Sequence, residues 1–426
     1  MTQRGLPQLS RLKVLYRDDG PDQLVGELAL GRTIAFQYDA AWLGHGLELS
    51  PEHLPLSVGR EIQFPPRGAM LHGLFADALP DAWGERIMRM AFQRLGVPWS
   101  DVTELDRLAA LGTRAIGALS FAPSHELQAS SPASGTFETL LHTVDTLLGG
   151  DPTDADANAL DRLQRVAGTA GGAQPKALVG LRESDGAISP DPEPPTGFTP
   201  YLVKLSPRIE AMNLSPASGT IEGAYFAMAR AAGLTVPATR IVHTSDGRAH
   251  FAIARFDRTA AGGRRHVHSL AGLLGRAPAD GFDYDELLTV TLNLTGDQRA
   301  LREAFARAAF NILAGNDDDH GRNTSFLLDP VRGWALSPAY DLIFQPGRGT
   351  RGMSVLGKEK EIRRADLVAL ADKHAIPRAV ATSIMQQVQA AVADWPSLAR
   401  AGEVPVDWQR DIEKVMAERA ARMFGA

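Results

Sequence analysis

The sequence predicts an α+β protein whose N-terminal part is rich in β-strands and whose C-terminal part is mostly helical. Three observations support this fold class. Short apolar runs broken by turn residues fill residues 12–35, the composition becomes linker-like between 123 and 168, and helical periodicity dominates after residue 268. A length of 426 residues is sufficient for two or three domains.

Local patterns predict each element in turn. Turn residues at 18–20 and 31 indicate hairpins within 12–35, and apolar residues at helical spacing predict helices over 74–95 and 137–148. Apolar runs predict strands at 177–181 and 201–205, followed by a helix from about residue 220 and a hairpin across 240–258. Towards the C-terminus, a helix at 300–314 precedes a hairpin formed by 325–328 and 334–336.

The composition excludes several classes of protein. With 44 Lys and Arg against 50 Asp and Glu, the net charge of −6 argues against a surface built chiefly to hold nucleic acid or an anionic membrane. The absence of Cys excludes a disulfide scaffold, a Cys zinc site and thiol catalysis. No apolar run approaches the ~20 residues of a membrane span, and the N-terminus lacks the apolar region of a signal peptide. We therefore expect a soluble, cytoplasmic protein without membrane contact.

The segment richest in chemical groups is G-N-D-D-D-H-G-R-N-T at 315–324. It follows the helix expected at 300–314, for which Gly315 is a suitable C-terminal residue. Three adjacent carboxylates repel one another, so a bound cation or a catalytic role is expected, with a solvated acidic loop as the alternative. A calcium-binding EF-hand is excluded because its twelfth position, counted from Asn316, is Leu327 and not Glu.

The spacing from Asp318 to Asn323 is that used for phosphoryl transfer to a hydroxyl group. Asp318 would accept the proton of the attacking hydroxyl, and Asn323, five residues later, would hold a magnesium ion. A second magnesium carboxylate is then required after the following hairpin. Asp341 lies there, although an ordinary turn aspartate is the alternative.

Nucleotide-binding features are expected upstream. The Gly-rich segment 168–174 would let backbone N–H groups approach phosphate oxygens, although a flexible turn is the alternative. Lys204 lies in an otherwise apolar strand, where its ammonium group must either reach solvent or meet anionic oxygens. Glu222 could pair with Lys204 or simply favour a helix N-terminus. Phe256 and Asp257 end the 240–258 hairpin, where a hinge strand would contact adenine through its backbone and ribose through a carboxylate.

Together these residues resemble the HipA family of bacterial serine/threonine protein kinases, the toxin components of type II toxin–antitoxin pairs. The matching motifs are A-G-G-A-Q-P-K (170–176), Y-L-V-K-L (201–205), R-F-D-R (255–258), G-N-D-D-D-H-G-R-N (315–323), L-S-P-A-Y-D-L (336–342) and M-S-V-L-G-K (353–358). The N-terminal part is similar to the β-rich subdomain of the family in Y-D-A-A-W-L (38–43) and G-L-F-A-D-A-L-P-D-A-W-G (73–84).

The resemblance implies a two-lobed, protein-kinase-like α+β fold that uses ATP and Mg²⁺. The expected segments are a β-rich subdomain (1–125), a linker with a short helix (126–160), a nucleotide-binding lobe (161–258) and a helical catalytic lobe (259–426). It implies that Asp318 is the catalytic base, that Asn323 and Asp341 are magnesium ligands, and that Lys204 binds the ATP phosphates. The other residues that it places at the nucleotide are Gly172, Ala173, Gln174, Phe256, Asp257, His320 and Tyr340.

The resemblance also implies regulation and partners. Family members inactivate themselves by autophosphorylating a serine in the Gly-rich loop, and Thr169 holds that place here. The chain also differs at His268 and Ser269, where an acidic pair is usual, and we expect this to alter the rim of the site. The implied partners are protein substrates, among which the family's known targets include aminoacyl-tRNA synthetases, and a small helix-turn-helix HipB-like antitoxin that would contact DNA in place of the kinase.

Two alternative functions remain open at this stage. The chain could phosphorylate a small molecule or a lipid head group. It could instead be a weakened kinase that serves as a co-repressor on a DNA-binding antitoxin.

Overall fold

The computed structural model describes residues 8–125, 127, 136–149, 157–167, 174–208, 215–259, 262–277, 279–346 and 352–425. The chain divides into two compact units. The first comprises Met1–Ser215, Thr244–Arg248 and Ala252–Arg276, and the second comprises Pro216–His243, Ala249–Phe251 and Ala277–Ala426. The four segments expected from the sequence remain a prediction. Within the described ranges, no helix is both long and apolar enough to span a bilayer.

The first unit begins with a four-stranded antiparallel sheet in the order β3-β2-β1-β4, which confirms the hairpins expected within 12–35. Alternate side chains of the first strand are buried, namely Leu12, Val14 and Tyr16, so one face of the sheet packs on the core. The strands are β1 (Arg11–Tyr16), β2 (Gln23–Leu30), β3 (Ile34–Tyr38) and β4 (Leu119–Ala122). Between β3 and β4 lie α1 (Ala40–His45), η1 (Leu56–Val58), α2 (Gly73–Ala76), α3 (Ala82–Arg94), η2 (Trp99–Asp101) and α4 (Glu104–Leu111).

The single helix expected over 74–95 is two helices, because the chain breaks between α2 and α3. Pro80 disfavours helical backbone in the residue before it. Asp81 then begins a new helix, since its side chain accepts a hydrogen bond of 2.9 Å from the Gly84 N–H and so caps the N-terminus of α3. The expected apolar stripe is nevertheless present, and Trp83 and Ile87 are buried on it.

The two strands expected at 177–181 and 201–205 are confirmed, and they pair with each other in a second antiparallel sheet. β5 (Lys176–Leu181) pairs with β7 (Thr199–Lys204) on one side and with β6 (Ile188–Ser189) on the other. α6 (Ala157–Val166) packs on β5, α3 and the expected helix α5 (Phe137–Gly149). β8 (Thr239–His243) and β9 (Ala249–Ala254) flank the expected turn, and β10 (His266–Ser269) leads into α8 (Leu270–Leu273).

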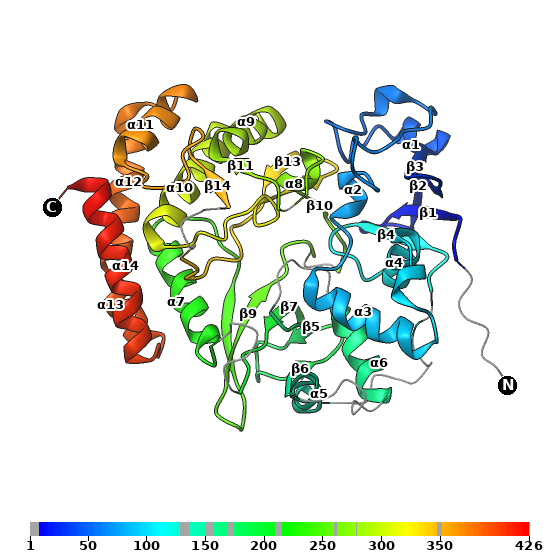
Figure 1. Cartoon of the computed structure of the whole chain (residues 1–426), viewed down its shortest axis with the longest axis horizontal. Coiled ribbons are helices and arrows are strands. Elements are labelled where there is room, and N and C mark those ends of the chain that lie inside the picture. Colours follow the sequence, from blue (N-terminus) through cyan, green and yellow to red (C-terminus); the bar gives the residue numbers. More distant parts are fainter. Residues whose placement is uncertain are drawn as a thin grey trace. The chain divides into compact units, whose positions relative to one another are not determined.

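The second unit is mostly helical, as expected, and α10 (Gln298–Ala314) lies at its centre. It packs against α9 (Tyr284–Thr295), α12 (Arg378–Ala393) and α14 (Val406–Phe424) (Figure 1). Its other helices are α7 (Ser218–Ala231), α11 (Arg364–Lys373) and α13 (Trp395–Ala401). The expected hairpin is formed by β12 (Ser325–Asp329) and β13 (Gly333–Leu336), and β11 (Phe282–Asp283) pairs in parallel with β14 (Met353–Ser354).

Candidate active site

The acidic loop 315–324 begins at the end of the buried helix α10, as the sequence predicts. Gly315 is the C-terminal cap, with a left-handed φ of 78° and an N–H that donates to the carbonyl oxygen of Asn311. A Cβ atom at this position would also lie 3.2 Å from the ring of Phe344, so glycine suits both the turn and the packing. The loop therefore starts from a rigid support.

The first and third aspartates of this loop are buried and held by distant residues. Asp317 forms a two-point ion pair of 2.6 and 2.9 Å with Arg419 on α14. Asp319 accepts hydrogen bonds from the Tyr284 hydroxyl and, at 3.2 Å, from the Met353 N–H. These partners relieve the repulsion that three adjacent carboxylates would otherwise suffer.

The second aspartate, Asp318, is exposed, and Asn323 lies against it. The Asn323 side-chain nitrogen donates to the backbone carbonyl of Asp318 at 2.6 Å, and its N–H donates to the His320 carbonyl at 2.8 Å. Because the amide nitrogen is used within the loop, the amide oxygen is the atom of Asn323 suited to receive a cation.

Asp341 follows the β12–β13 hairpin in a strained conformation. Its φ of 56° is left-handed, which costs a non-glycine residue ~1 kcal/mol and is a feature that gathers at functional sites. Its backbone carbonyl lies 3.5 Å from the side-chain nitrogen of Asn316, which ties this segment to the acidic loop. The structure thus connects the segments that carry Asp318, Asn323 and Asp341.

His320 and Tyr340 help to shape the same turn. His320 is half-buried, and its Nδ1 accepts from the Arg322 N–H at 3.3 Å. The Tyr340 hydroxyl donates to the Arg322 carbonyl at 2.6 Å and lies 2.6 Å from the Ser325 hydroxyl. Contact of either residue with a nucleotide remains a prediction.

A buried polar network behind the loop was missed by sequence reasoning. Asn316 donates to the Asn311 side chain at 3.1 Å, Asn311 donates to the Tyr284 hydroxyl at 3.0 Å, and Tyr284 bonds to Asp319. The network borders a cavity of about 10 Å³, enough for one water molecule. The one local signal was Asn311, an amide among the apolar residues at the C-terminal end of α10.

In the first unit, Lys204 shares one end of the second sheet with another lysine. The strand register places Lys176 directly opposite Lys204, and both side chains are buried. Lys176 forms an ion pair with Asp81, and Trp83 donates to the Lys176 carbonyl at 3.3 Å. Because like charges directly opposite one another destabilise a strand pair, this end of the sheet favours anionic groups. Lys176 and Asp81 carried no predicted role, although both lie in motifs noted above.

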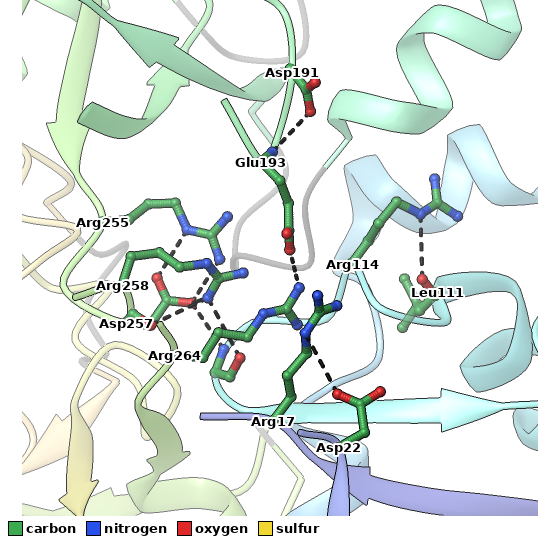
Figure 2. Close-up of polar contacts among 11 residues, drawn as sticks. Arg17, Asp22, Leu111, Arg114, Asp191, Glu193, Arg255, Asp257, Arg258 and Arg264 are labelled. Atoms are coloured by element: carbon green, nitrogen blue, oxygen red, sulfur yellow. Dashed lines mark hydrogen bonds and ion pairs between the residues drawn. The ribbon is translucent and has the colours of Figure 1, made fainter. Parts of the chain in front are cut away.

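Asp257, expected to contact ribose, is buried among ion pairs (Figure 2). Arg255 contacts its carboxylate at 2.9 and 2.7 Å, Arg258 at 2.7 Å, and the Gly117 N–H donates to it at 2.9 Å. Burial alone would raise the pKa of this carboxyl group, but the two arginines and the hydrogen bond hold it well below its usual range. A ribose hydroxyl would have to compete with these donors for the Asp257 carboxylate, and contact of Phe256 or Asp257 with a nucleotide remains a prediction.

His268 and Ser269 do not have the exposed placement that a site rim requires, because both are buried. Asp77, from the G-L-F-A-D motif, accepts from Ser269 N–H and Oγ at 2.7 Å each, and lies 2.7 Å from His268 Nδ1. His268 Nε2 is 3.1 Å from the Ser50 hydroxyl. His268 and Ser269 therefore form hydrogen bonds to Asp77 of the G-L-F-A-D motif and do not line an exposed site rim.

The remaining predicted residues are placed only in part. Thr169, Gly172 and Ala173 lie outside the residues that the structure describes. Gln174 is partly exposed immediately before β5, and Glu222 is buried in the first turns of α7.

Comparison with solved structures defines the class of fold. A structure described as the Shewanella oneidensis MR-1 toxin–antitoxin system HipA, HipB and its operator DNA complex matches with a TM-score of 0.66 at 20% identity. The match covers 96% of this chain and 97% of that one. It confirms the expected two-lobed, kinase-like α+β fold.

Sequence comparisons define the family. Residues 168–395 match the model of the HipA-like C-terminal domain, and residues 17–122 match that of the HipA N-terminal domain. The chain therefore belongs to the HipA family.

Two curated proteins are similar in sequence. The serine/threonine-protein kinase toxin HipA of Shewanella oneidensis is 24% identical over 349 residues, which cover 76% of this chain and 73% of that protein. A putative kinase, Y4dM, of Sinorhizobium fredii is 32% identical over 135 residues, which cover 29% of this chain and 33% of that protein.

Proposed function

We propose that this protein is an ATP- and Mg²⁺-dependent serine/threonine protein kinase that acts as the toxin of a HipA-type toxin–antitoxin pair. The observation that carries the proposal is the difference in environment among three adjacent aspartates. Asp317 and Asp319 are buried, and distant parts of the chain hold their carboxylates. Asp318 is exposed beside Asn323. A positioned, solvent-facing carboxylate is what transfer of phosphate to a hydroxyl requires.

In the proposed reaction, Asp318 orients the acceptor hydroxyl and receives its proton. The side-chain oxygens of Asn323 and Asp341 would hold magnesium, which supplies charge neutralisation on the phosphates. Within the described residues, no three His, Asp or Glu side chains are grouped to hold a metal, so this pair would depend on phosphate oxygens and water to complete the coordination. Mg²⁺ is commonly bound in this way, through one or two protein ligands together with the substrate's phosphates.

Lys204 would bind the ATP phosphates. Its support is the burial of Lys204 at the end of the otherwise apolar strand β7, directly opposite Lys176, whose own ammonium group is paired with Asp81. Gly172, Ala173 and Gln174 would approach the phosphates through their backbone. Phe256 and Asp257 would contact the adenosine part, with His320 and Tyr340 lining the nucleotide site. Thr169 is the proposed autophosphorylation residue.

Replacement of the carboxylate tests the catalytic proposal. Asp318→Ala should abolish phosphate transfer to protein while ATP binding is retained, because Asp318 acts on the acceptor. Asp407→Ala, which removes another exposed carboxylate of the same unit, should keep full activity. Full kinase activity in Asp318→Ala would remove Asp318 from the mechanism.

The proposed partners are a protein substrate, such as an aminoacyl-tRNA synthetase, and a HipB-like antitoxin through which DNA is bound indirectly. The antitoxin proposal is supported by the related HipA, whose solved structure contains HipB and operator DNA. Incubation with cell lysate and labelled ATP should label a protein band. Labelling of small molecules alone would favour a small-molecule kinase, and no ATP turnover under any magnesium condition would favour a co-repressor.

Autophosphorylation has a separate test. Mass spectrometry of the purified protein should find a phosphate on Thr169. The Asp318→Ala protein should lack that phosphate if the chain modifies itself.

A further inference from the structure

The first unit contains a cluster of four arginines near the end of β9, which we call the arginine cluster (Arg17, Arg255, Arg258 and Arg264). Three of them, Arg255, Arg258 and Arg264, have side chains only 3–6% exposed. Arg17 follows β1 and lies beside Arg264 (Figure 2). Burial, together with the charges of Arg17 and Arg255, lowers the pKa of Arg264, although Glu193 opposes the shift. The cluster therefore holds more positive charge than its surroundings easily accommodate.

Among the residues described, three carboxylates pair with these four guanidinium groups, which leaves one positive charge in excess. Asp257 is buried and is shared by two members of the cluster. Glu193 pairs with Arg264, but its own side chain is 49% exposed. Asp22 is 42% exposed and lies 3.6 Å from Arg17. Because exposed ion pairs contribute little, one carboxylate provides most of the compensation for the buried charge.

Two buried donors in the cluster are also unsatisfied. Nη1 of Arg255 and Nη1 of Arg264 have no hydrogen-bond partner in the part of the chain that the structure describes. A buried donor without an acceptor destabilises the protein, and more so when it carries charge. Burial and the neighbouring Arg255 and Arg264 charges likewise lower the pKa of Arg258 to about 10, against the effect of Asp257. An added anion would relieve both the charge excess and the unmet hydrogen bonds.

The Glu193 side chain is placed at the cluster by a preorganised loop. The Glu193 N–H donates to the Asp191 side chain at 2.9 Å, and prolines flank Glu193 on both sides. Pro194 lies against β5 so closely that a Cβ atom at Gly180 would come within 2.4 Å of it. The loop backbone is therefore held in place, whereas the exposed carboxylate can swing into solvent without moving it.

We propose that the arginine cluster is a binding site for a phosphate group and that the Glu193 carboxylate occupies the position of the phosphate in its absence. Arginine pairs with phosphate oxygens through two parallel N–H groups. A phosphate offers three or four oxygens and up to two negative charges, which can satisfy both free Nη1 groups and replace Glu193 on Arg264. A single carboxylate could not do all three. This inference does not rest on the proposed kinase activity, although Arg255 and Arg258 also hold the carboxylate of Asp257.

Calorimetric titration of the full chain with inorganic phosphate at constant ionic strength tests this site. Saturable binding is expected in the wild-type protein. Glu193→Gln should bind about tenfold more tightly, equivalent to about 1.4 kcal/mol, because the internal competitor is removed. Arg264→Gln should lose saturable binding.

Matched controls come from an exposed pair in the same unit. Arg182 and Asp185 form a two-point ion pair on a turn, with side chains 42% and 50% exposed. Asp185→Asn makes the same change of net charge as Glu193→Gln, and Arg182→Gln makes the same change as Arg264→Gln. Both controls should bind phosphate as the wild type does.

Further outcomes discriminate between ligands. Glycerol 3-phosphate titrated in parallel shows whether the site prefers esterified or free phosphate, and binding of either supports it. Equal binding of acetate would overturn the assignment to phosphate. Glu193→Gln changes an exposed residue, so a folded variant without saturable phosphate binding would overturn the site itself. So would unchanged affinity in an Arg264→Gln protein with a native circular dichroism spectrum.

Discussion

The ion pair between Arg419 and Asp317 gives a quantitative prediction about the support of the acidic loop. The two side chains are 18% and 6% exposed, and both nitrogen–oxygen contacts are shorter than 3 Å. Arg419→Gln removes the Arg419 cation from the buried Asp317 carboxylate, and breaking a buried ion pair costs about 3–5 kcal/mol. It also removes a 2.9 Å hydrogen bond to the Ile312 carbonyl, worth ~1 kcal/mol. Because Arg419 retains some access to water, we expect a loss of about 3 kcal/mol.

Urea unfolding followed by circular dichroism measures this loss in the free energy of unfolding. Arg422→Gln, an exposed arginine on the same helix, is the control and should change stability by less than ~0.5 kcal/mol. The double variant Arg419→Gln/Asp317→Asn should be more stable than the sum of the single effects predicts, because the buried charge is also removed. A loss below ~1 kcal/mol in Arg419→Gln, or strict additivity in the double variant, would refute this account of the loop.

Three other predictions concern single residues. Gly352→Ala should lower the unfolding free energy by ~1–3 kcal/mol, measured by urea unfolding, since the new methyl group would lie 2.5–3.0 Å from acidic-loop backbone; an unchanged value would contradict the packing. Asp81→Asn removes the Asp81 carboxylate from the buried Lys176 ammonium group and should cost about 3 kcal/mol in the same assay; adding Lys176→Met to this variant should restore part of the lost stability. Burial and a neighbouring histidine lower the pKa of His266 to about 3. Below pH ~6.5 this imidazole is therefore protonated in the unfolded chain but still neutral in the folded protein. The free energy of unfolding should fall by about 1.4 kcal/mol per pH unit between that pH and pH 3. His266→Gln should remove this contribution to the pH dependence, whereas the exposed His142→Gln should not.

Local patterns in the sequence were sufficient for most elements. The helix α10, its terminal Gly315 and the hairpin after the acidic loop all follow from periodicity and turn residues close together in the chain. Pro80 indicated a break in the helix before Asp81. The helical spacing of apolar residues continues across 74–95, however, and so predicted one uninterrupted segment. Such a spacing reports which residues face the core, and both α2 and α3 place their apolar side chains there.

The roles of the three aspartates could be predicted only in outline. Their adjacency indicated a special loop, but the partner of Asp317 lies 102 residues away and that of Asp319 lies 35 residues away. Neither Arg419 nor Tyr284 carries a local sign of this contact, because an arginine on an amphipathic helix usually faces solvent. Long-range polar pairing is set by how helices pack, which the pattern of a single segment does not contain.

The G-L-F-A-D-A-L-P-D motif at 73–81 has a consequence for biosynthesis. Asp77 bonds to residues 268 and 269, and Asp81 bonds to residue 176, so the earliest part of the polypeptide completes its contacts with parts made much later. Contacts this distant in sequence form slowly and leave partly folded intermediates exposed to aggregation. The bonds of Asp77 therefore cannot be completed until residue 269 has been synthesised, whereas Asp81 can pair with Lys176 about 90 residues earlier, and a chain truncated between residues 177 and 267 would keep the second contact and lose the first.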